Sequence, residues 1–294
     1  MKRILYGVLA LLAGCSGNEG NYDASGTFEA TEVIVSSEAS GRLMRFDVEE
    51  GQTLRAGETV GIVDTVQLYL KRLQLLTNRR AVDTRRQDIA KQIAATEEEI
   101  AKQRREKART EGLLERQAAN RKQLDDIESA IAVLEKQLAA QRSTLERGNR
   151  GVDEESSALD VQVAQIDDQL AKCRIASPID GTVLVKYAEP GEVTAAGKPL
   201  FKAADVRHMR LRAYVTSGQL TGLKLGQRVT VYADEGEERS RPYEGTVSWI
   251  ADQAEFTPKT IQTRDERANL VYAVKIDVPN DGLLKIGMYG DVKF

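Results

Sequence analysis

The longest pattern along the chain is a heptad-like spacing of apolar residues between about Val66 and Lys172. This stretch contains no proline and is rich in Gln, Glu, Lys, Arg, Ala and Leu, which are all strong helix formers. Its apolar positions recur at steps of three, four or seven residues in two runs: Leu124, Ile127, Ile131, Leu134, Leu138 and Leu145, then Leu159, Val163, Ile166 and Leu170. A narrow apolar stripe on charged helices indicates a coiled coil rather than globular packing. The pattern therefore predicts long paired helices over 66–172.

Two short β-motifs flank these helices and match each other in register without a gap. The first, GRLMRFDVEEGQTLRAG, begins at Gly41, and the second, GTVLVKYAEPGEVTAAG, begins at Gly181. Their shared glycines adopt positive φ at little steric cost and so indicate the same turns. Because both motifs belong to one β-domain, the helical stretch must leave that domain and return to it, which predicts a helical hairpin.

The turn of the hairpin is expected near 117–120, at the midpoint of the helical stretch. Asn120 suits the N-cap of the returning helix, because its side chain can accept from a backbone N–H two or three residues later. In the returning arm, Gly148 and Gly151 each cost about 1 kcal/mol relative to Ala, so we expect a helix break near 148–154. The matching upstream region, 77–88, is poor in apolar residues, and its continuity stays open.

After Asp205 the pattern changes to alternating strands. Gly- and Pro-bearing turns bound most of these segments, which are 209–215, 226–234, 243–252, 269–278 and 288–294. Strands of this number and period suit a small antiparallel β-barrel.

The N-terminus carries a targeting pattern. A basic pair precedes a short apolar stretch, 4–12, which is too short to span a bilayer as a helix of about 20 apolar residues. Leu-Ala-Gly then precedes Cys15, which resembles a bacterial lipoprotein signal that is cut before a lipidated cysteine. We therefore expect a lipoprotein signal peptide at 1–14, lipidation of Cys15 and a flexible linker at 15–26. An ordinary secretory signal with an incidental cysteine is the alternative.

Composition excludes several classes of function. Lys and Arg number 42 against 45 Asp and Glu, a mixed charge that gives no case for nucleic-acid binding. His208 is the only histidine, so histidine-based triads and multi-histidine metal sites are excluded. The sequence has no Walker A motif and should hydrolyse no nucleotide. We therefore predict no catalytic residue, no cofactor and no metal. Cys173 is interpreted as a small buried residue, with a reactive thiol as the alternative.

The two half-motifs look like the split lipoyl/biotinyl fold, with the long helices in place of the short joining hairpin. Together with the lipoprotein signal, the segment IASPIDGTV at 175–183 and the barrel strands, they resemble the HlyD-type periplasmic adaptor (membrane fusion protein) family. The resemblance implies an elongated, multidomain α+β fold. A long coiled-coil hairpin, 66–172, is inserted in a split lipoyl-like β-sandwich, 27–65 plus 173–205, and a small antiparallel β-barrel, 206–294, follows. The end of the pattern after GMYGDV favours the short adaptors that serve ATP-driven exporters.

The resemblance also implies a function and a location. The chain would be a non-catalytic adaptor in the periplasm of a Gram-negative bacterium, held by its lipid anchor to the cell membrane, with the inner membrane preferred. It would link an inner-membrane transporter of the ABC type to a TolC-type outer-membrane channel. Its copies would form a homo-oligomeric ring, with six copies expected from the family.

Two groups of residues are candidates for partner contacts. Adaptors that engage such a channel carry at the hairpin tip an Arg, a Leu four residues later and a Ser seven residues beyond it. In this sequence the register gives Arg109, Leu113 and Asn120, with Asn in place of Ser. The loop 253–267 is long for a barrel connection. Its candidate contacts with the transporter or the membrane are Phe256, Pro258 and Lys259, a packed loop over the barrel end being the alternative.

Two other functions compete with the adaptor. One is a structural lipoprotein whose coiled coil spans the envelope, with the tip residues as ordinary helix surface. The other is a biotinyl or lipoyl carrier, which is disfavoured because the Met-Lys-Met or Asp-Lys-Ala turn of those carriers is absent from the sequence.

Overall fold

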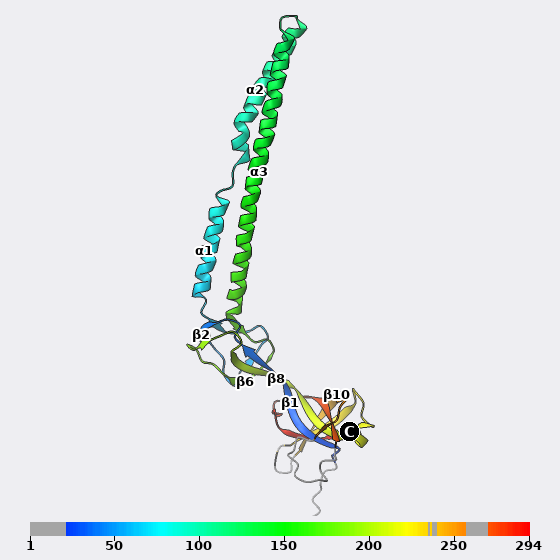
Figure 1. Cartoon of the computed structure of the whole chain (residues 1–294). Helices are drawn as coiled ribbons and strands as arrows, with labels where there is room; N and C mark the ends of the chain where they lie inside the picture. Colours follow the sequence, from blue (N-terminus) through cyan, green and yellow to red (C-terminus); the bar gives the residue numbers. More distant parts are fainter. Residues whose placement is uncertain (1–21, 235, 237–239, 257–269) are drawn as a thin grey trace, which may run out of the picture.

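The computed structural model describes residues 22–234, 236, 240–256 and 270–294. Their arrangement is elongated: a helical hairpin rises from one β-domain, and a second β-domain lies at the opposite end (Figure 1). The expected signal peptide and Cys15 lie outside the described residues, as do Pro258 and Lys259.

The hairpin has one interrupted arm and one continuous arm. α1 (Val66–Asp83) and α2 (Ile89–Glu115) form the outgoing arm, and α3 (Arg121–Lys172) forms the returning arm. α1 and α2 lie in succession along α3 (Figure 1). The buried apolar residues at the seam between the arms are Val82, Ile93, Ile100, Ile131 and Ile166. The hairpin expected from the heptads and the repeat is therefore confirmed.

The expected break in the returning arm is wrong. α3 is continuous through Gly148 and Gly151, and the interruption lies in the outgoing arm, between Asp83 and Ile89. A Cβ added at either glycine would meet nothing within 4 Å, so neither position is required by local packing. Burial along the seam outweighs the propensity cost of about 1 kcal/mol per glycine, because most helical stability in proteins comes from packing.

Polar side chains of α3 hold the interrupted arm. The Gln87 N–H donates to Asn149 Oδ1, and Asn149 Nδ2 donates to the Gln87 carbonyl oxygen, both at 2.9 Å. Ser156 Oγ bonds to the Asp83 carboxylate at 2.9 Å. Two ion pairs flank these bonds, Arg85 with Glu155 and Arg86 with Asp153. Helix ends leave backbone groups without intrahelical partners, and Asn149 supplies them here. We call the paired bonds between Asn149 and Gln87 the break clasp.

The split sandwich draws strands from both repeats. One sheet has the order β5 (Arg174–Ala176), β4 (Thr59–Val63), β2 (Gly41–Phe46) and β7 (Val193–Thr194). β3 (Thr53–Leu54) and β6 (Gly181–Lys186) belong to the second sheet, with β1 (Ala24–Ser36) and β8 (Pro199–Thr216). The core includes Leu43, Phe46, Leu54, Val63, Val183, Leu200 and Phe201.

Equivalent turns of the two repeats bond to each other's strands. The Gly51 N–H donates to the Val183 carbonyl oxygen at 2.8 Å, and the equivalent Gly191 N–H donates to the Leu43 carbonyl oxygen at 2.7 Å. Gly51 and Gly191 have φ angles of 86° and 91°, which glycine adopts without strain. The expected register of the repeat is thus confirmed, and each half-motif completes the other.

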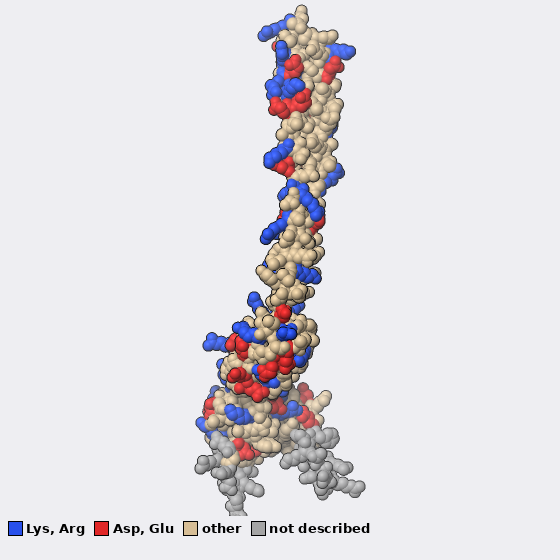
Figure 2. All heavy atoms as spheres, turned by 90° about the vertical axis from the view of Figure 1, so that its left-hand side faces the viewer, with Lys and Arg blue, Asp and Glu red and all other residues tan. Residues whose placement is uncertain are grey.

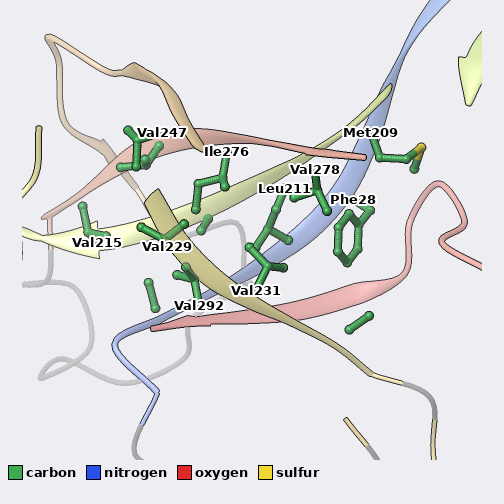
Figure 3. Packing of buried hydrophobic residues seen from close by; sticks show 14 of the residues in the cluster. Phe28, Met209, Leu211, Val215, Val229, Val231, Val247, Ile276, Val278 and Val292 are labelled. Carbon is green, nitrogen blue, oxygen red and sulfur yellow. The ribbon is translucent and has the colours of Figure 1, made fainter. Parts of the chain in front are cut away.

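The second β-domain is a closed, six-stranded barrel. Its strands follow the order β8, β12 (Leu270–Pro279), β10 (Ser240–Ile250), β9 (Arg228–Asp234), β13 (Tyr289–Lys293) and β1, which pairs with β8 again. A short helix, α4 (Ser217–Leu220), follows β8, and β11 (Glu255–Phe256) lies at the edge of β12. Phe28, Leu211, Val231 and Ile276 are among the side chains that fill the barrel (Figure 3). The fold class expected from the sequence is confirmed.

β1 is the strand that the alternating pattern after Asp205 could not reveal. With β8 it runs through both β-domains, and its start lies inside the stretch expected to be a flexible linker: Ala24 pairs with Val292, and Gly26 pairs with Gly290. A Cβ at Gly26 would lie 2.0 Å from the Arg212 carbonyl oxygen, so the backbone of β1 is packed closely against β8. Residues 24–26 are therefore part of the barrel and not of a linker.

Candidate functional site at the hairpin tip

The end of α2 is closed by a backbone motif that normally uses glycine. The Gln117 N–H donates to the Leu114 carbonyl oxygen and the Ala118 N–H donates to the Leu113 carbonyl oxygen, each at 2.9 Å. This pair of bonds is the Schellman motif, which requires a left-handed residue after the helix. Gln117 takes that conformation with φ of 58°. A left-handed backbone costs a non-glycine residue about 1–2 kcal/mol, so the tip carries local strain.

The start of α3 is closed by Asn120, as the sequence indicated. Asn120 has extended backbone angles, and its Oδ1 accepts from the Lys122 N–H at 3.0 Å. The N-cap assignment is therefore confirmed. Because the Schellman motif closes one end and the N-cap the other, the connecting segment 116–120 is held at both ends.

The other two tip candidates lie on the last turns of α2. Arg109 and Leu113 are four residues apart and so share one face of the helix. Leu113 is 39% exposed, although it is a large apolar residue, and Arg109 is exposed. Within the described part of the chain Arg109 has no ion pair. The structure therefore brings Arg109, Leu113 and Asn120 to the same end of the molecule.

Cross-arm ion pairs distinguish the shaft from the tip. Just below the tip, Lys107 Nζ lies 2.8 Å from Glu128 Oε1, and this hydrogen bond raises the pKa of the Lys107 ammonium. Further pairs join the two arms along the shaft: Arg72 with Asp167, Arg79 with Asp160, and Arg104 with Glu135. Six arginines of the hairpin are engaged with the partner arm, whereas Arg109, like the tip arginines Arg116 and Arg121, has no ion pair among the described residues and is available to another molecule.

A second surface lies on α1 and was missed by the sequence reasoning. Its residues are Val66, Tyr69, Leu70 and Leu73, which are between 40% and 55% exposed. They recur at the i, i+3, i+4, i+7 spacing of one helix face, beside the face that packs on α3. We call them the α1 stripe. Figure 2, in which the side of α1 faces the viewer, shows little charge on the lower shaft and more near the tip.

The remaining candidates sit elsewhere. Of the three loop candidates, only Phe256 lies among the described residues, and only its backbone is described: it ends β11, opposite Leu270. Cys173 is 1% exposed and burial raises the pKa of its thiol, which supports the buried-residue interpretation. The described residues contain no group of His, Cys, Asp or Glu suited to a metal ion. None of the helices described is both long and apolar enough to cross a membrane.

The chain is similar to known proteins both in sequence and in fold. No family model matches the chain. It is 27% identical to a UPF0194 membrane protein of Citrobacter koseri over 284 residues, which cover 90% of this chain and 85% of that protein. It is 28% identical to the UPF0194 membrane protein YbhG of Salmonella gallinarum over 290 residues, which cover 92% of this chain and 87% of the relative.

Two solved structures share its architecture. MacA from Actinobacillus actinomycetemcomitans superposes with a TM-score of 0.57 at 19% identity, covering 92% of this chain and 76% of MacA. The membrane fusion protein Spr0693 from Streptococcus pneumoniae R6 gives a TM-score of 0.54 at 17% identity, covering 92% of this chain and 96% of Spr0693. At these identities the likeness concerns the fold, so the chain has the membrane fusion protein fold that the sequence indicated.

Proposed function

We propose that this chain, which has the fold of the membrane fusion proteins, is a non-catalytic periplasmic adaptor of an export system. Its hairpin tip docks on an outer-membrane channel of the TolC type, and its opposite end meets an inner-membrane transporter, for which an ABC-type exporter is the proposed partner. Membrane attachment through a lipid on Cys15 belongs to the same proposal. The names of the UPF0194 relatives, which are called membrane proteins, support a location at a membrane.

One observation carries the docking role. Leu113 is 39% exposed near the far end of the shaft, whereas the heptad residues of α3 are buried or partly buried; Arg109, which has no ion pair among the described residues, lies one turn away. An exposed Leu beside a free guanidinium suits a contact with another protein, because Leu supplies apolar area and Arg can donate to backbone oxygens or carboxylates. The two caps fix the tip and reduce the entropy lost on docking.

The α1 stripe supports assembly from several copies. An apolar helix face that the chain itself leaves uncovered calls for a partner surface. A head-to-tail contact that buries the α1 stripe of one copy against the next copy would cover this face, and such contacts generate rings when they close. A ring of six is the proposed assembly.

The docking role is tested by in-cell crosslinking from a photoreactive residue placed at Ala118. Ala118 is exposed and its side chain takes part in neither cap, whereas a replacement at Asn120 would remove the N-cap of α3. We expect adducts with an outer-membrane channel protein, identified by mass spectrometry of the crosslinked peptides. Leu113→Asp should reduce them sharply, because a buried, unpaired carboxylate at the contact is costly.

Val133→Asp is the matched control, because Val133 is 55% exposed on α3 away from the tip and the change is of the same kind. It should leave the adducts unchanged. Adducts formed only between copies of the chain would refute channel docking and favour the structural lipoprotein. Equal loss with both variants would show a defect in folding and not at the contact, and would also refute the assigned role of Leu113.

A further inference from the structure

Gln117 occupies a backbone position that the rest of the described chain reserves for glycine. Nine other described residues have positive φ, and all nine are glycines, among them the repeated turns at Gly51 and Gly191. The Schellman motif at the end of α2 would accept glycine at position 117 equally well and without the left-handed strain. The fold of the tip therefore does not explain why position 117 is a glutamine and not a glycine.

The side chain of Gln117 does not stabilise the hairpin. Its backbone N–H caps α2, but among the described residues its carboxamide makes no hydrogen bond, and the residue is exposed. It stands four residues after Leu113, in the short segment held between the two caps. The caps fix the backbone there, so the carboxamide projects from a rigid support.

We propose that Gln117 is a specificity-determining contact of the docking tip and that its carboxamide pairs with a free peptide group of the partner. This rests on the proposed function of the tip. A carboxamide both donates and accepts, so it can bond to a backbone N–H and a backbone C=O together. The hairpin contains such a pairing, because Asn149 bonds to both backbone groups of Gln87 at 2.9 Å. The docking partner therefore presents a loop or strand end at this contact. The backbone N–H and C=O groups of that segment have no hydrogen-bond partner before docking.

The test compares two substitutions that separate docking from folding. Gln117→Gly removes the carboxamide and relieves the left-handed backbone, whereas Gln117→Ala removes the carboxamide and keeps the strain. We expect channel adducts from Ala118 to fall about fivefold in both, as for the loss of roughly one net hydrogen bond. The thermal midpoint of the purified full-length chain, followed by helical circular dichroism, should rise for Gln117→Gly and stay near the parent value for Gln117→Ala.

In Gln117→Gly the thermal midpoint should rise while the yield of channel adducts falls. A purely structural role of Gln117 cannot give this combination. Adduct yields that remain at the parent level in both variants would overturn the inference, while a sharp loss with Leu113→Asp would leave the docking role itself intact. If Leu113→Asp also leaves the adducts unchanged, the tip is not the docking surface and both proposals fall.

Discussion

Replacing Asn149 with Ala should weaken the hairpin at the interruption of its outgoing arm. Asn149 makes two hydrogen bonds of 2.9 Å to the backbone of Gln87, in the segment that joins α1 to α2. Each bond contributes about 1 kcal/mol net, so the loss is roughly 2 kcal/mol. Ala has a helix propensity better than that of Asn by about 0.6 kcal/mol. The free energy of unfolding should therefore fall by about 1–1.5 kcal/mol.

The assay is urea unfolding of the purified chain, followed by helical circular dichroism, with amide exchange at residues 84–92. Protection of the Gln87 amide should fall about tenfold in Asn149→Ala, since 1.4 kcal/mol corresponds to one factor of ten. Arg150→Ala is the control: Arg150 is the next residue of α3 and is exposed, and among the described residues it has no ion pair. If Asn149→Ala is no less stable than Arg150→Ala and the Gln87 amide exchanges at the parent rate, the break clasp does not hold the arm.

Three further predictions concern single positions. Gly148→Ala and Gly151→Ala should each raise the stability of the hairpin by up to about 1 kcal/mol in the same unfolding assay, because an added Cβ meets nothing within 4 Å; a loss of stability would show that the glycines serve the fold. Gly26→Ala should destabilise the barrel by several kcal/mol or prevent its folding, because the new Cβ would lie 2.0 Å from the Arg212 carbonyl oxygen; an unchanged melting temperature would contradict the close pairing of β1 with β8. In a Cys15→Ser chain, Cys173 should react with a maleimide far more slowly in the folded than in the urea-unfolded state, because burial raises the pKa of its thiol; equal rates would exclude a buried thiol.

The sequence by itself determined the features whose signals are local and periodic. Heptad spacing predicted the paired helices, because a two-helix seam buries every third or fourth residue. The repeated glycines predicted two equivalent turns, and Gly51 and Gly191 have the positive φ that only glycine adopts readily. Asn120 was recognisable as an N-cap because a cap depends on residues within three positions of it.

Only the tertiary structure decided the features that depend on segments far apart in the chain. Helix propensity placed the interruption at Gly148 and Gly151, but packing along the seam keeps α3 continuous, and the break lies opposite, where Asn149 bonds to Gln87. The barrel strand at Ala24 was hidden because its partner Val292 is at the other end of the sequence. The left-handed φ of Gln117 follows from closing the hairpin over a segment of few residues, and no pattern of residue types encodes that geometry. Local preferences set the elements of this protein, and long-range contacts determined where they break, where they begin and which side chains remain free at the tip.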